Sequence, residues 1–438
     1  VRLKTGVKKD GTLVAREAEI HLDTGGYADN GPQVAIRAAT RVLGPYRIPH
    51  IRSDAYAVYT NSGGAGSFRA IGAPQTIFAS ESQIDRIASE LGIDPAELRL
   101  KNLLQRGEQV HSKLRGMDAN LASSLKKLVA RSGWRRRSKK RAAPIGLAVG
   151  ATNAGATPIS VALVRLQADG IVTVLAGSTE MGQGVRTVLS QIAAEELDLP
   201  LASVRIGGAD TAFTPYDSST GSSRSTTLMG RAVQAAAQDL KKQLVHVAAG
   251  AFSVKASRVT VQDGALICGE ARISFKEALQ RRFGGPGGEL IGRGDVGPEI
   301  TGSLPVFWEI GMGTAELDID EETGEVRVRR YVSLADVGKA IHPEQCIGQE
   351  EGAAMMGVGH TLFEQMIYDE GKLINPNLAD YRVPGFSDVP VEFESILVEN
   401  RDGPGPHGAR GMGEGGIVSA APAIANALAR AAGVRIRD

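Results

Sequence analysis

Alternating apolar and polar residues open the chain and predict two paired strands, Val1–Lys8 and Thr12–His21. After a loop, apolar residues recur at helical spacing over Phe78–Leu91 and predict a helix. Asp94-Pro95 then predicts the start of another helix, with Asp94 as the N-cap and Pro95 in the first helical position.

The same two patterns return in the second part of the chain. Hairpins are expected at Ser160–Gln167 with Ile171–Ala176 and at Thr314–Asp320 with Glu325–Leu334, and helices at Gly184–Leu197, Gly348–Gln365 and Val418–Ala432. Because strands and helices are mixed without a regular βαβ alternation, the predicted fold class is α+β.

Residues 112–144 interrupt these patterns with a concentration of positive charge. The run consists of Lys126, Lys127, Arg131, Arg135, Arg136, Arg137, Lys139, Lys140 and Arg141. We interpret 112–144 as an exposed basic connection between a domain over 1–111 and a second domain over 145–438, because 438 residues exceed what one small core organises. A nucleic-acid-binding module built on 126–141 is the alternative, although Trp134 is the only aromatic residue in that run.

Composition and charge narrow the classes of function. A net charge of +1 gives no general reason for a polyanionic partner. Cys268 and Cys346 are too few and too far apart for a disulfide framework, a zinc site or an iron–sulfur cluster. The seven histidines include no pair at H-x-x-x-H spacing. Neither a signal peptide nor a membrane span is expected, since the most apolar long stretch, 415–433, is Ala-rich and contains Arg430.

Glycine and small hydroxyl residues gather in four segments at the junctions of predicted elements: 61–75, 180–184, 218–225 and 408–416. A strand–glycine–helix junction presents backbone amides and the positive end of a helix, an arrangement that suits a phosphate group. The segments match neither the P-loop nor the dinucleotide fingerprint, which argues against a nicotinamide cofactor.

The last of these segments holds one carboxylate, Glu414, among residues that are mostly glycine. Backbone without side chains can approach a large flat ligand closely, and a lone acid there is a candidate general base aimed at a bound cofactor. The alternative is a glycine-rich turn with a solvated glutamate.

Taken in order, the segments resemble the molybdenum-binding large subunit of the xanthine dehydrogenase/aldehyde oxidase family of molybdenum hydroxylases, over nearly the whole chain. Ser67-Phe-Arg-Ala-Ile-Gly-Ala-Pro-Gln75 is similar to the family's Phe-Arg-Gly-x-Gly-x-Pro-Gln loop, with Ala70 in place of one glycine. The other matching motifs are Gly92-Ile-Asp-Pro95, Glu180-Met-Gly-Gln-Gly184, Ser222-Ser-Arg-Ser225, Asp336-Val-Gly338, Gly348-Gln349 and Gly411-Met-Gly-Glu414.

The resemblance implies two molybdenum cofactor-binding domains of mixed sheets and helices, the first of them incomplete. It implies that Glu414 takes a proton from the molybdenum-bound hydroxide, while the pterin dithiolene, and no protein side chain, holds the metal. The implied cofactor-binding residues are Gln183, Gly182, Gly184, Phe68, Arg69, Ser222, Ser223, Arg224, Ser225, Gln349 and Gly413, and the implied substrate residues are Arg37 and Ile71.

The implied cofactor is molybdenum–molybdopterin in a dinucleotide form such as the cytosine dinucleotide, with [2Fe-2S] and FAD on an iron–sulfur subunit and a flavin subunit. The family's Phe-Gly-Gly-Lys segment is absent from this sequence. A further chain or segment is therefore expected to supply the N-terminal half of the molybdenum subunit. The implied location is cytoplasmic, or periplasmic through a signal on a partner subunit.

Two positions bear on the substrate. Purine-oxidising relatives carry an aromatic ring where Ile71 stands, and carbon monoxide dehydrogenases carry a copper-binding cysteine where Gly66 stands. The resemblance therefore implies oxidation of an aldehyde or an N-heterocycle with water-derived oxygen. The alternative function is a non-catalytic pterin-binding scaffold or paralogue subunit.

Overall fold

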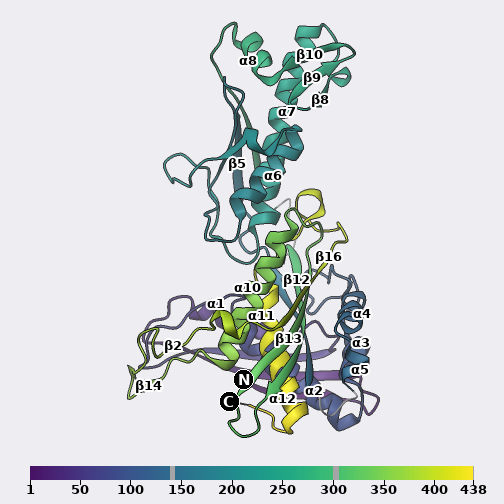
Figure 1. Cartoon of the computed structure of the whole chain (residues 1–438), viewed down its shortest axis with the longest axis vertical. Coiled ribbons are helices and arrows are strands. Elements are labelled where there is room, and N and C mark those ends of the chain that lie inside the picture. Colours follow the sequence, from purple (N-terminus) through teal and green to yellow (C-terminus); the bar gives the residue numbers. More distant parts are fainter. Residues whose placement is uncertain (139–143, 299–304, 438) are drawn as a thin grey trace.

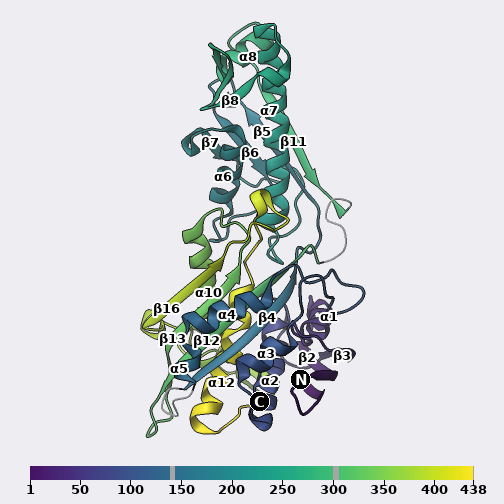
Figure 2. The same cartoon turned by 90° about the vertical axis from the view of Figure 1, so that its right-hand side faces the viewer.

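The computed structural model describes residues 1–138, 144–298 and 305–437; Lys139, Lys140 and Arg141 of the basic run lie outside these ranges. The molecule is elongated, with a broad lower body, a narrower upper lobe and a small tip along its long axis (Figure 1, Figure 2). Sheets and helices are mixed without a regular βαβ alternation, so the predicted α+β class is confirmed.

A four-stranded sheet in the order β16-β13-β12-β4 forms the centre of the lower body. Its strands are β4 (Ile145–Ala154), β12 (Phe307–Ile319), β13 (Val326–Asp336) and β16 (Glu392–Val398). The predicted hairpin is confirmed as the antiparallel pair β12–β13, whereas β13 and β16 are parallel. Every residue of β4 is buried, because the sheet is covered on both faces.

Helices pack around this sheet: α2 (Ala73–Leu91), α3 (Pro95–Asn102), α4 (Leu121–Arg131), α5 (Trp134–Arg137), α10 (Pro343–Leu362), α11 (Gly415–Val418) and α12 (Ala420–Ala432). Asp94 caps α3 as predicted, because its Oδ1 accepts hydrogen bonds from Ala96 N at 2.8 Å and Glu97 N at 3.3 Å. Helices α2 and α10 begin five residues earlier than predicted, each with a proline in the first turn, where its missing N–H costs nothing.

The basic segment differs from the exposed connection expected for it. Leu121, Leu125 and Leu128 of α4 are buried in one hydrophobic cluster with Trp134 and with residues of the central sheet. These leucines recur at helical spacing, so one face of α4 packs on the sheet while Lys126, Lys127 and Arg131 stay exposed. Part of the positive charge is also neutralised, since Arg131 pairs with Glu394 and Arg137 pairs with Glu316.

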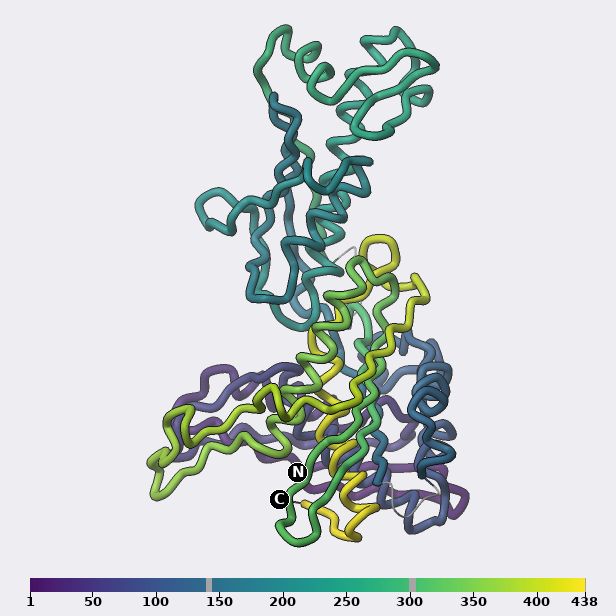
Figure 3. Tube along the Cα trace, in the orientation of Figure 1, coloured from purple at the N-terminus to yellow at the C-terminus, as the bar shows by residue number. Residues whose placement is uncertain are grey.

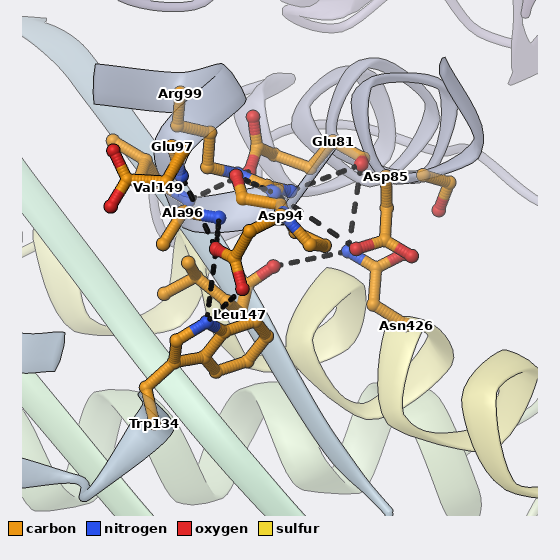
Figure 4. Close-up of polar contacts among 12 residues, drawn as sticks. Glu81, Asp85, Asp94, Ala96, Glu97, Arg99, Trp134, Leu147, Val149 and Asn426 are labelled. Carbon is orange, nitrogen blue, oxygen red and sulfur yellow. Dashed lines mark hydrogen bonds and ion pairs between the residues drawn. The ribbon is translucent and has the colours of Figure 1, made fainter. Parts of the chain in front are cut away.

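A buried polar network joins the beginning of the chain to the central sheet (Figure 4). Arg99 Nε and Val149 N both donate to Glu81 Oε2, each at 2.8 Å. Asn426 of α12 donates to Leu147 O at 3.1 Å. Helices α2 and α3 therefore share one interior with β4 and α12.

Strands β1 (Arg2–Val7), β2 (Leu13–Gly25) and β3 (His50–Tyr59) form a second sheet, covered by α1 (Gly31–Arg41). The predicted first hairpin is confirmed as the antiparallel pair β1–β2, and β3 lies parallel to β2. The hairpin of β14 (Tyr368–Asp369) and β15 (Lys372–Leu373) extends beside this sheet (Figure 1, Figure 3).

The upper lobe contains a sheet in the order β11-β5-β6-β7, with bounds Leu290–Val296, Ser160–Leu166, Val172–Ala176 and Val204–Ile206. The predicted hairpin β5–β6 is confirmed. Helices α6 (Val185–Leu197) and α7 (Gly230–Phe252) share a hydrophobic cluster with this sheet. The tip consists of β8 (Thr260–Gln262), β9 (Ala265–Cys268), β10 (Ala271–Ser274) and α8 (Phe275–Phe283) (Figure 1).

Within the described ranges, every helix is too short or too polar to cross a bilayer.

Candidate active site

A cavity of about 570 Å³ lies between the upper lobe and the lower body. All four glycine-rich segments line it, together with the start of α10. The residues predicted for the site that line this cavity are Phe68, Arg69, Ile71, Gly182, Gln183, Ser222, Ser223, Arg224, Ser225, Gln349, Gly413 and Glu414. Larger hollows of about 900 Å³ beside α7 and α8 and about 790 Å³ beside α4 contain none of these residues.

Glu414 immediately precedes α11 and forms part of the cavity wall, with 8% of its surface exposed. Its Oε2 is buried and has no hydrogen-bond partner. A buried acceptor without a partner is costly, so this oxygen is placed to receive a donor from a bound molecule. The alternative interpretation, a solvated glutamate in a turn, does not describe this geometry.

Glu309 belongs to the same site, and sequence reasoning missed it. It lies on β12, is 2% exposed, and contacts the segment that carries Glu414 from outside the lining of the cavity. Its Oε1 accepts hydrogen bonds from Glu414 N at 2.7 Å and Gly415 N at 2.6 Å, and its Oε2 accepts one from Ser223 Oγ at 2.5 Å. Burial, and then the negative charge of Glu414, raise the pKa of Glu309 above the usual value for a glutamate.

The hydroxyl segment 218–225 contacts the Glu414 segment through Ser223. Ser222 and Ser223 both have left-handed backbone conformations, with φ of 52° and 49°. Such conformations are strained for residues with a side chain and persist where the surroundings fix them. Here Ser223 Oγ accepts a hydrogen bond from Gly413 N at 3.0 Å while donating to Glu309.

Arg69 connects the first glycine-rich segment to the last. Its Nε donates to Gly413 O, and its Nη2 donates to Gln349 Oε1 at 3.0 Å and to Gln349 O at 3.2 Å. The ring of the neighbouring Phe68 packs on His360 of α10, with centroids 4.2 Å apart. The segment therefore keeps a fixed position against α10.

The junction before α6 is arranged differently from the phosphate cradle expected there. Glu180 accepts hydrogen bonds from Gly182 N, Gly184 N and Arg186 N at 2.9, 3.0 and 3.1 Å, so these amides are already occupied. Burial alone would raise the pKa of Glu180, but these three amides outweigh it and lower the pKa. Gln183 donates to Thr179 O at 2.8 Å and accepts from Met181 N at 2.7 Å, although its side chain lines the cavity.

Arg37, expected to contact substrate, is half-buried on α1 and is not among the residues that line the cavity. Gly184, the residue before α6, is likewise outside the lining. Arg41 is the α1 arginine that reaches the site: it is 4% exposed and donates to Ile71 O at 2.7 Å. It thus holds the backbone of the predicted substrate residue Ile71.

Two buried arginines fix the walls of the cavity. Arg224 forms an ion pair with Asp217 at 2.6 Å and donates to Ile159 O at 2.7 Å, so its guanidinium holds the 218–225 segment in place. Arg410 pairs with Asp118 at 2.9 Å and Asp402 at 2.8 Å, which anchors the segment that carries Glu414. Among the described residues, no group of three His, Cys, Asp or Glu side chains could hold a metal ion.

Comparisons with known proteins agree with this geometry. Two family models, each described as a molybdopterin cofactor-binding domain, match residues 1–103 and 121–390. The xanthine dehydrogenase molybdenum-binding subunit of Escherichia coli O157:H7 is 32% identical over 98% of this chain, and the chain spans 59% of that subunit's length.

Solved structures give the same result. Quinoline 2-oxidoreductase from Pseudomonas putida 86 is 25% identical, with a TM-score of 0.84, over 98% of this chain and 59% of its own. Aldehyde oxidoreductase from Desulfovibrio gigas is 26% identical, with a TM-score of 0.83, over 99% of this chain and 47% of its own. The chain therefore belongs to the xanthine dehydrogenase/aldehyde oxidase family of molybdopterin-binding proteins, as its motifs predicted.

Proposed function

We propose that this chain is the molybdenum-binding part of a hydroxylase that oxidises an aldehyde or a neutral N-heterocycle with oxygen from water. The observation that carries the proposal is Glu414 Oε2, a buried acceptor without a partner in a wall of the cavity that the four glycine-rich segments form. A carboxylate placed in this way can take a proton from a bound reactant, which is the role of a general base.

The polar lining of the cavity fits a molybdopterin cofactor. Thr220 Oγ1 and Gln345 Oε1 are, like Glu414 Oε2, buried atoms of the lining that have no protein partner. Gln345, Gln349 and the hydroxyls of 218–225 would hold the pterin and its nucleotide, for which the cytosine dinucleotide is the proposed form. When bound, the cofactor supplies the electron acceptor and activates the water, while the protein binds, orients and moves the proton.

The charges around the cavity favour a neutral substrate. The guanidinium and ammonium groups that line it within the described ranges already interact with protein acceptors; they belong to Arg69, Arg224, Lys339 and Arg410. An anionic substrate would therefore find no unengaged cation among them. Ile71 and Phe68 add apolar surface, which suits an aldehyde or an N-heterocycle.

Electrons taken from substrate must leave the site, and the chain has neither an iron–sulfur nor a flavin motif. We therefore propose an iron–sulfur subunit and a flavin subunit as partners. We also propose that a further chain or segment completes the molybdenum subunit. A cytoplasmic assembly is the proposed location.

The proposal is tested by purifying the protein with its native partners, measuring molybdenum, and identifying the extracted pterin. Turnover is then compared with benzaldehyde, quinoline and xanthine as substrates. We expect bound molybdenum, and faster oxidation of the aldehyde or of quinoline than of xanthine. Stoichiometric molybdenum without turnover of any substrate would support the alternative, a non-catalytic scaffold, and a preparation that never binds molybdenum would overturn both.

Replacing Gly66 by cysteine is not expected to confer carbon monoxide oxidation, even with copper supplied. A Cβ at Gly66 would lie 2.6 Å from Asn30 Oδ1 and 2.7 Å from Asp29 Oδ2. Asn30 would have to move and would release Ser67, whose backbone N donates to Asn30 Oδ1 at 2.8 Å. The measurement is dye reduction under carbon monoxide, and turnover above that of the unmodified protein would contradict this expectation.

A further inference from the structure

Two further carboxyl groups lie behind Glu414 and outside the lining of the cavity. Glu309 of β12 is 2% exposed, and Glu350 of α10 is fully buried. Like charges repel strongly where little water screens them, so three neighbouring buried carboxyls do not all stay ionised at neutral pH. At least one of the three is therefore expected to hold a proton.

The backbone that follows Glu414 is shaped around both groups. A Cβ built on Gly415 would lie 3.4 Å from Glu309 Oε1, and a Cβ built on Gly416 would lie 2.9 Å from Glu350 Oε2. The missing side chain of Gly415 thus leaves room for the Glu309 carboxyl, and that of Gly416 leaves room for the Glu350 carboxyl. The three carboxyl groups consequently meet around a single short stretch of backbone.

Glu309 and Glu350 differ in their hydrogen bonds. Glu309 accepts hydrogen bonds from the backbone N–H groups of Glu414 and Gly415 and from the Ser223 hydroxyl. Backbone N–H groups can only donate, so Oε1 of Glu309 must remain an acceptor in any protonation state. Glu309 thereby fixes the peptide that carries Glu414.

Glu350 has no such support, since neither of its carboxyl oxygens has a hydrogen-bond partner. The nearby Ser333 hydroxyl shares a hydrogen bond with Ser395 Oγ at 3.1 Å, in which either hydroxyl can be the donor. An ionised carboxylate without partners in the interior is very costly, whereas the neutral acid is much less so. Burial, and then the charge of Glu309, raise the pKa of Glu350 to about 8, against the opposing effects of Arg69 and of the Ser333 hydroxyl.

Other ionisable groups face the pair from the surrounding elements: Arg69 before α2, Arg41 of α1, Tyr331 of β13 and Cys346 of α10. Arg69 directs its hydrogen bonds to Gly413 O and Gln349, and Arg41 directs its own to Ile71 O and Asn153. The two guanidinium groups therefore lie near the carboxyls without forming a hydrogen bond to either of them.

We propose that Glu309 and Glu350 are a pair of positioning residues for Glu414: Glu309 holds its backbone, and Glu350 stays protonated so that the negative charge resides on the carboxylate that faces the cavity. This inference rests on the proposed role of Glu414 as a base. When the pH rises through the titration of Glu350, its proton leaves to solvent and a second uncompensated negative charge appears behind Glu414.

Infrared spectroscopy tests the protonation directly and needs no turnover. The C=O stretch of a protonated carboxylic acid should be present in the wild-type protein at neutral pH and should disappear at alkaline pH. Glu350→Gln should weaken this band, and the intensity that remains should come from Glu309, whose pKa is also raised by burial. The matched control, Glu344→Gln, changes an exposed carboxyl on the same helix and should leave the band unchanged. A wild-type protein without the band, or a band of unchanged intensity in Glu350→Gln, would overturn the protonated state of Glu350.

The pH dependence of stability gives an independent measurement. The pKa of Glu350 is higher in the folded protein than the usual 4.5, so the folded state binds more protons between 4.5 and about 8. Stability should therefore fall as pH rises through this window and should level off above it. Glu350→Gln cannot titrate, so its Tm relative to that of the wild type should rise from about pH 5 to about pH 8. A difference in Tm that stays constant across this range would contradict the proposal.

The positioning role of Glu309 is tested with two substitutions in the assembled enzyme. Glu309→Gln keeps an acceptor oxygen for the two backbone N–H groups, and Glu309→Leu removes it. We expect Glu309→Leu to lower kcat by about a hundredfold relative to Glu309→Gln, with little change in KM, because misplacing a catalytic group by about 1 Å has effects of this size. Equal kcat values would overturn the positioning role. If the wild type does not turn over but the infrared band behaves as stated, the proposed function fails while the protonated Glu350 stands.

Discussion

Replacing Glu414 by glutamine is expected to lower turnover by roughly 10²–10⁴-fold, the usual contribution of a general base. Glutamine has nearly the same size and keeps an acceptor oxygen, but it cannot take up a proton at neutral pH. The backbone N–H of residue 414 would still donate to Glu309, so the loop and the cavity should keep their shape. Molybdenum content should consequently stay close to that of the wild type.

Turnover and molybdenum content must be measured on the same preparation, because lost cofactor would imitate a lost base. Glu344→Gln is the matched control, since it removes an exposed carboxylate outside the cavity and should leave both quantities unchanged. A Glu414→Gln enzyme with full cofactor and more than about a tenth of wild-type turnover would exclude Glu414 as the base.

The sequence could predict those parts of the site that are recognisable within one short stretch of the chain. The glycine-rich segments and Glu414 stand out because backbone without side chains and an isolated acid are visible in the sequence, and the structure brings them to one cavity. Glu309 was missed because its partners, Ser223, Glu414 and Gly415, come from other segments and meet only after β12 has packed. One signal existed in the sequence: Glu309 is a lone carboxylate within the otherwise apolar run Phe307-Trp-Glu-Ile-Gly-Met312.

The predictions were wrong where the groups of a segment are already bonded or buried within the protein. The motif around Gln183 suggested free amides before α6, but Glu180 of the same motif occupies the amides of Gly182, Gly184 and Arg186. Positive charge at 126–137 suggested an exposed connection; the cations of α4 are exposed, but Leu121, Leu125 and Leu128 on its other face are buried. In both cases the sequence shows which groups are present, while burial and geometry decide which of them remain available to a ligand.

Replacing Gly411 by alanine is expected to disrupt the cavity and to remove most of the turnover. A Cβ on Gly411 would lie 1.6 Å from Ser223 O and 2.7 Å from Ser223 C, both of which are backbone atoms. No rotamer change relieves such a contact, so the 408–416 and 218–225 segments must separate. Separation would weaken the hydrogen bonds that Ser223 Oγ makes with Gly413 N and Glu309. We expect a loss of stability of about 1–3 kcal/mol, as for other overpacked sites.

Because that separation displaces Glu414 together with its supports, turnover should fall by at least about a hundredfold even in molecules that stay folded. Denaturant unfolding gives the loss of stability, and turnover per bound molybdenum gives the catalytic loss.

Gly250→Ala is the matched control: Gly250 is exposed within α7, and a Cβ there would meet nothing within 4 Å. That alanine should raise stability by about 0.5–1 kcal/mol through the lower chain entropy of the unfolded state, without changing turnover. Near wild-type turnover in Gly411→Ala would mean that the two segments can separate without moving the base, and close contact between Gly411 and Ser223 would then have no part in catalysis.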